Sequence, residues 1–182
     1  MSVSDAIQEV IERLSIDDVG ISSSEIYSSE EFSPMRSEMN IQVQMRAAFT
    51  GFRVIEGTED FPLALLQLHY DLGVRAVTET RSKEESSDSE DETPPIVWVV
   101  EAKMFAQYRE DSADALSELS QESIEGFGQA NALYHVWPYW REFVHSSLDR
   151  MRMPVIAVPM FRLNKEHWAK SGGEAKKLAS SK

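Results

Sequence analysis

The sequence predicts an α+β fold: an antiparallel β-sheet of about four strands, a long amphipathic helix packed on one face, and a short helix at the N-terminus. Two observations support this prediction. Apolar and polar residues alternate over 41–55, 63–78 and 96–108, which is the period of a β-strand. A helical period follows only afterwards, over 138–152, and strands grouped before a helix are typical of the α+β class.

The N-terminal residues have the pattern of a short amphipathic helix that ends near residues 15–18. Ser4 suits the N-cap, because its side chain can accept a backbone N–H of the first turn. The helix packs either on the core of its own chain or on another chain. Residues 21–32 follow as a weak, serine-rich extended segment. The apolar residues at helical spacing are Val3, Ile7, Val10, Ile11 and Leu14.

The strands at 63–78 and 96–108 carry apolar residues on both faces. Antiparallel sheets commonly keep one face in contact with water, and a single layer of helix covers only one face. We therefore expect the second face to meet another subunit or a ligand. Gly51, in the first of the alternating segments, marks a bulge or a bend.

The strongest helical pattern begins at Pro138, because proline is tolerated in the first turn of a helix. Pro154 is expected to end that helix. Residues 112–131 are polar and predict a connection or a marginal helix, broken by Gly126 and Gly128.

We expect one domain over residues 1–163. Within it, residues 82–93 combine a block of acidic charge with almost no apolar content, which predicts a disordered loop. That loop is either a solvated hairpin connection or an acidic docking tag. Residues 164–182 are polar and predict a flexible C-terminal tail.

Composition excludes several classes of function. The formal net charge of −13 argues against DNA, RNA or an anionic membrane as partner, because these need a basic surface. The absence of cysteine excludes disulfides, thiolate metal sites and cysteine nucleophiles. No stretch approaches the roughly 20 apolar residues of a membrane span, so we expect a cytoplasmic protein with no membrane insertion.

No pattern of a catalytic, metal or cofactor site occurs in the sequence. The histidines do not have the spacing of a helical zinc site, and no phosphate-binding loop or nucleophile elbow is present. We therefore expect neither an enzyme nor a bound cofactor or metal. The histidines are His69, His135, His145 and His167.

The region 134–159, YHVWPYWREFVHSSLDRMRMPVIAVP, resembles the signature region of SecB-type chaperones. In that family an aromatic–Pro–Tyr–x–Arg–Glu sequence leads into the long helix, and a proline-containing apolar segment follows it. The preceding strands also have the order and spacing of the family, so the resemblance covers roughly residues 21–163. The matching positions are Trp137, Pro138, Tyr139, Arg141, Glu142, Pro154 and Pro159. Apart from the resemblance, Pro138 and the Arg141–Glu142 pair can simply begin a helix and lie on its polar side.

The resemblance implies a holdase: an ATP-independent chaperone that binds unfolded polypeptides in apolar grooves. It also implies a homotetramer, a dimer of dimers, and a role in protein export with the SecA motor as partner. Three features depart from the family: the leading helix at 4–14, the acidic insertion at 82–93, and MFRLNKEHWAKSGG in place of its closing sequence. They favour a divergent member of the family. Its clients are either exported proteins or, as for some such relatives, a dedicated client such as the antitoxin of a toxin–antitoxin pair.

Two alternatives lie outside the chaperone class. One is a non-catalytic structural or adaptor subunit that uses its apolar sheet face for assembly only. The other is a small-ligand binder with the sheet as the floor of its pocket.

Candidate client-binding residues are apolar side chains in excess of what one core can hold. Those on the two strands form either the client groove or the interface between subunits. The others are aromatic residues at the ends of segments, where amphipathic rings commonly make contacts. The candidates are Leu63, Leu65, Val77, Val97, Val99, Phe105, Trp137, Tyr139 and Phe161.

Deletion of residues 82–93 should leave both the melting temperature and the capture of unfolded protein nearly unchanged, because the segment has almost nothing apolar to bury. Calorimetry and an aggregation-suppression assay on the deletion variant measure the two quantities. Loss of capture with an unchanged melting temperature would identify the segment as a docking element.

Overall fold

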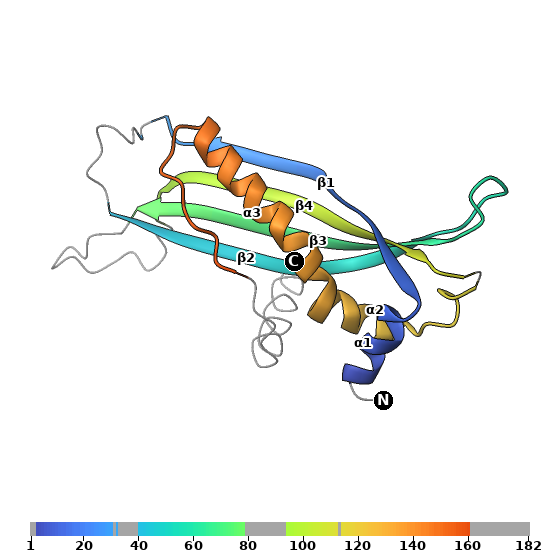
Figure 1. Ribbon diagram of the computed structural model, residues 1–182. Coiled ribbons are helices and arrows are strands. Elements are labelled where there is room, and N and C mark those ends of the chain that lie inside the picture. The colour runs from blue at the N-terminus through green and yellow to red at the C-terminus, as the bar shows by residue number, and fades with distance from the viewer. Residues whose placement is uncertain (1–2, 31, 33–39, 79–93, 113, 161–182) are drawn as a thin grey trace, which may run out of the picture.

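The structure is a four-stranded antiparallel sheet with helices on one of its faces (Figure 1). The computed structural model describes residues 3–30, 32, 40–78, 94–112 and 114–160. The loop predicted at 82–93 and the tail predicted at 164–182 lie outside the described residues. In chain order the elements are α1 (Val3–Ile11), β1 (Leu14–Ser28), β2 (Ile41–Ile55), β3 (Leu65–Thr78), β4 (Ile96–Glu110), α2 (Gln121–Phe127), the π-helical turn η1 (Gly128–Ala132) and α3 (Leu133–Arg150).

The strand order is β1-β4-β3-β2, and every neighbouring pair is antiparallel. β2, β3 and β4 follow one another as neighbours, whereas β1 pairs with β4, so β1 and β2 form the two edges of the sheet. α3 lies obliquely across the strands on one face (Figure 1). The predicted fold class is confirmed, including the long helix, the short N-terminal helix and the bulge at Gly51.

The boundary between the first helix and the first strand was predicted wrongly. α1 ends at Ile11 rather than near residues 15–18, and Leu14 already belongs to β1, where it pairs with Glu110. The strand therefore runs from Leu14 to Ser28, not over 21–32. Leu14 fits both a helical and a strand period, and its pairing with β4 decides between them.

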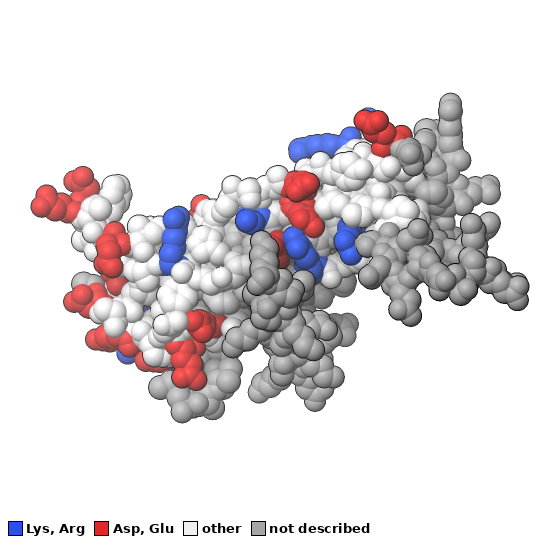
Figure 2. Space-filling model, turned by 180° about the vertical axis from the view of Figure 1, so that it is seen from behind, with Lys and Arg blue, Asp and Glu red and all other residues white. Residues whose placement is uncertain are grey.

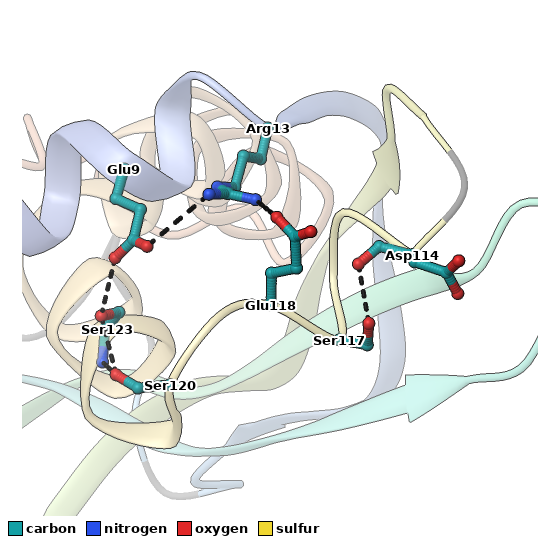
Figure 3. A network of polar contacts seen from close by, with 7 residues as sticks. All are labelled: Glu9, Arg13, Asp114, Ser117, Glu118, Ser120 and Ser123. Atoms are coloured by element: carbon teal, nitrogen blue, oxygen red, sulfur yellow. Dashed lines mark hydrogen bonds and ion pairs between the residues drawn. The ribbon is translucent and has the colours of Figure 1, made fainter.

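Polar contacts fasten α1 to the region around α2 (Figure 3). The Ser123 hydroxyl donates to the Glu9 carboxylate at 3.4 Å, and the Arg13 guanidinium lies 3.9 Å from Glu9 and also donates to Glu118. Val10, the neighbour of Glu9 in α1, is completely buried in the hydrophobic core. Of the two alternatives for this helix, the structure shows packing on the core of its own chain.

The main helix begins earlier than predicted. α2, η1 and α3 follow one another without a break, so Pro138 lies inside α3 instead of in its first turn. A proline there removes one backbone hydrogen bond. Leu133 and Val136, which precede it, are completely buried, and their burial keeps the chain helical on both sides of the proline.

Gly128, predicted to break the chain, lies within this continuous helical run at a close approach to the sheet. A Cβ atom on Gly128 would lie 2.5 Å from the Phe49 ring of β2, which is less than contact distance. The Tyr70 hydroxyl of β3 donates to the Gly128 carbonyl at 2.8 Å. Glycine therefore lets the helix backbone approach the Phe49 ring closely, and a larger residue would force this ring to move.

The core lies between α3 and the two central strands. Val136, Trp140 and Val144 line the buried side of α3, each with at most 1% of its surface exposed. On β3 and β4, alternate residues point toward the helix and are almost completely buried. They are Leu66, Leu68, Tyr70, Leu72, Val74 and Ala76 on β3, and Trp98, Val100, Ala102, Met104, Ala106 and Tyr108 on β4.

At the rim of this core, the Tyr108 hydroxyl lies 2.7 Å from Nδ1 of His135. Burial raises the pKa of Tyr108 and lowers the pKa of His135 from its ordinary value of 6.5, because both charged forms lose solvation. Burial and then the nearby Arg53 lower the pKa of His69 in the same direction. Folding therefore favours the neutral form of both imidazoles.

We expect the melting temperature to fall as pH decreases from about 7 to about 5.5, because the unfolded chain binds protons that the folded histidines resist. The contribution of the neutral histidines to stability is complete above their pKa in the unfolded chain. It is lost as the pH falls below that value. His135→Gln should make this fall shallower, and thermal melts of both proteins at several pH values measure it. An equally steep fall in the variant would mean that other groups carry the pH dependence.

Candidate functional site

The sheet has two faces of opposite character. Residues directly opposite each other on antiparallel strands share a face, so the strand registers assign every side chain to one side. We call the side beneath α3 the helix face and the other side the open face. On β3, for example, Tyr70 points to the helix face and His69 to the open face.

The middle of the open face is polar. The Arg46 guanidinium of β2 lies 3.0 Å from the Asp71 carboxylate and 2.9 Å from that of Glu101, so it joins three strands. Figure 2 shows basic and acidic side chains side by side across this face. A second chain of hydrogen bonds crosses all four strands through Arg53, Gln67, Gln107 and Asp17.

The predicted strand candidates lie along this open face but do not form one apolar groove. Val77 and Val97 are buried in the protomer, with 1% and 2% of their surfaces exposed. Leu65, Val99 and Phe105 are partly exposed, and the polar residues of the middle of the face separate them. Both central strands do carry apolar side chains on this face, and charged and amide side chains alternate with them. That the open face meets another subunit or a ligand stays a prediction.

The remaining candidates are scattered over other parts of the fold. Leu63 is partly buried just before β3. On α3, Trp137 is partly buried and its indole N–H donates to the Pro159 carbonyl at 2.8 Å, while Tyr139 is 55% exposed. Phe161 lies outside the described residues.

Exposed apolar side chains gather instead on the helix face of the two edge strands. On β1, Ile16, Ile21 and Ile26 are 48%, 42% and 45% exposed. The residues opposite them on β4 are at most 2% exposed and belong to the core. These opposite residues are Tyr108, Met104 and Val100. We call the three isoleucines the β1 strip.

A matching set lies on the helix face of β2. Val43, Met45 and Val54 are 36%, 43% and 40% exposed, and we call them the β2 strip. Their partners on β3 are Ala76, Val74 and Leu66, which are at most 2% exposed. The apolar surface of the helix face therefore extends beyond the helix layer on both sides.

Sequence reasoning missed the β1 strip because of two bulges. The pairing of β1 with β4 shifts by one residue between Ile16 and Asp18, and again between Ile21 and Ser23. Each bulge adds a residue and reverses the alternation, so isoleucines five positions apart lie on the same face. The β2 strip does have a signal in the sequence, since Val43 and Met45 belong to the alternation over 41–55, but alternation alone does not tell how much of each side chain is exposed.

The outer side of α3 borders a depression of about 500 Å³. Its walls are about two turns of α3 and the extended chain that follows the helix. The residues around the depression are Pro138, Arg141, Glu142, His145, Val155, Ile156, Ala157 and Val158.

In the described part of the chain, no group of three or more His, Asp or Glu side chains could hold a metal ion. No helix among the described residues is long and apolar enough to cross a bilayer.

No known family model and no curated protein matches this chain. Among solved structures, it is similar to the Rv1957 SecB-like chaperone of Mycobacterium tuberculosis, determined in complex with a ChAD peptide from the HigA1 antitoxin Rv1956. The likeness has a TM-score of 0.63 at 11% sequence identity, and it covers 87% of this chain and 97% of that chain. At this identity the likeness shows the fold: the chain has a SecB-like α+β fold, as its sequence predicted.

If the strips are free surfaces, polar substitutions in them should change stability little. We expect Val43→Thr to lower the free energy of unfolding by no more than about 1 kcal/mol, because Val43 is already partly solvated. Val74→Thr is the matched control on the neighbouring strand, where burial of the hydroxyl should cost about 1–3 kcal/mol. Urea denaturation measures both, and equal losses would place the β2 strip inside a packed interface.

Proposed function

We propose that this protein is an ATP-independent chaperone, a holdase that binds unfolded polypeptides on the helix face of its sheet. The observation that carries the proposal is the pair of exposed apolar strips flanking the core. Exposed apolar side chains that gather in rows are typical of surfaces that bind another molecule. The SecB-like fold supports the same function, since the structural neighbour is a chaperone bound to an antitoxin peptide.

Binding would be driven by the burial of apolar surface. Every Å² of apolar surface removed from water contributes about 25 cal/mol, and unfolded chains expose the apolar segments that folded proteins hide. A protein that binds the unfolded state alone holds it by mass action, without nucleotide. The flexible thioether of Met45 adapts to varied partners, and the net charge of −13 attracts basic segments and opposes non-specific aggregation.

The proposal includes assembly of the chain into a homo-oligomer, with a tetramer as the expected form. The client is either exported protein delivered to SecA or a dedicated partner such as an antitoxin. The alternative is a structural or adaptor subunit in which the strips serve assembly only. The same two strips would then be covered by another copy of the chain.

The experiment follows the aggregation of a reduced, unfolded model protein at a stoichiometric ratio of chaperone and without nucleotide. The wild type should suppress aggregation. A variant with Ile16, Ile21 and Ile26 all changed to Thr should suppress it several-fold less, because threonine keeps the β-branched shape but removes apolar surface. Light scattering of each protein gives the subunit count.

The control variant carries Val99→Ser and Phe105→Gln on the open face, which should leave capture intact. Weakened capture by the β1-strip variant, with its mass unchanged, supports the proposal. Dissociation of that variant supports the assembly alternative. If the wild type fails to suppress aggregation at all, the holdase function is wrong.

A further inference from the structure

The extended chain after α3 is fixed against the helix by a defined reversal. The backbone N–H of Arg152 donates to the Asp149 carbonyl at 3.0 Å, and that of Met153 donates to the Leu148 carbonyl at 2.9 Å. Arg152 adopts a left-handed φ of 58°, as residues at this position of a Schellman turn do. The chain therefore turns back along α3 instead of leaving the fold, and we call residues 153–160 the strap.

The strap is held mainly through its carbonyl groups. Trp137 donates from its indole to the Pro159 carbonyl at 2.8 Å, and Arg141 donates from Nε to the Val158 carbonyl at 3.0 Å. Because Trp137 and Arg141 are one helical turn apart, they reach two successive carbonyls of an extended chain. Arg141 also donates from Nη1 to the Met160 sulfur at 2.9 Å. Carbonyl groups are common to every polypeptide, so the two carbonyl contacts recognise backbone and not a particular sequence.

The side chains of the strap alternate as in a bound extended peptide. Val158 is 4% exposed and Ile156 is packed against the core, whereas Val155, Ala157 and Pro159 are exposed. The strap has no regular secondary structure, and the prolines at 154 and 159 have no N–H to donate. It is therefore anchored to the helix layer by a few apolar side chains and two donors, without a strand ladder.

We propose that the strap occupies a groove along α3 that also accepts an extended segment of an unfolded client, so that the strap competes with the client. This inference rests on the proposed holdase function. The occupant is a client chain in extended form with an apolar residue at every second position, because the strap itself shows that such a chain fits. The affinity for clients is then reduced by the fraction of molecules whose groove is free.

The test changes the strap and leaves the groove intact. Val158→Ser removes the buried anchor, and Val155→Ser is the matched control, since it makes the same change at a position that is 46% exposed. The probe is a fluorescein-labelled, reduced and carboxymethylated α-lactalbumin, whose binding is followed by fluorescence anisotropy. Val158→Ser should tighten binding by about three- to tenfold, because less competition remains, and Val155→Ser should leave it within about twofold.

A second measurement does not depend on the stability of that variant. The chain has no cysteine, so Val158→Cys places a single thiol on the buried side of the strap. Its reaction with a thiol reagent should be slow in the free protein and several-fold faster with saturating client, because the client displaces the strap. Val155→Cys should react rapidly in both states.

The outcomes separate the strap from the general function. If the wild type binds the unfolded probe but Val158→Ser does not tighten binding and the Val158→Cys thiol is not accelerated, the strap is only structural and the inference is overturned. If the wild type does not bind the probe, the holdase proposal fails and the inference fails with it.

Discussion

The packing of one helix layer on a wider apolar sheet is the constraint on which the rest of this structure depends. α3 buries Trp140 and its neighbours on the two central strands, and the edge strands extend their apolar rows beyond it. The contact is close enough that Gly128 has no room for a side chain beside Phe49. Because α3 does not extend over the edge strands, the β1 and β2 strips stay partly in water.

The open face differs from the helix face in the polar contacts that run along its middle. Arg46 pairs there with Asp71 and Glu101, and hydrogen bonds link Arg53 to Asp17 through two glutamine side chains. Ion pairs this exposed contribute little to stability. They keep the middle of this face solvated. The exposed apolar side chains of the two strips lie on the other side of the sheet, which is also the side of the strap.

Much of the fold was predictable because its elements have strong local periods. β2, β3 and β4 alternate clearly, and the apolar stripe of α3 repeats at helical spacing, so the α+β class followed from the sequence. β1 was predicted poorly because two bulges reverse its alternation and Leu14 suits a helix as well as a strand. Pro138 was misplaced for a related reason: burial of Leu133 extends the helix past a residue that locally favours a helix start.

The sequence by itself determined the order of strands and helices, the absence of cysteine chemistry, and the resemblance of 134–159 to SecB-type chaperones. It also showed that the sheet carries more apolar surface than one helix can cover. Only the tertiary structure decided where that surplus lies: on the helix face of the edge strands, at Ile21 and Met45, and not on the open face at Val99 and Phe105. The physical reason is that alternation fixes which side chains share a face, whereas exposure depends on how far a distant element extends over them.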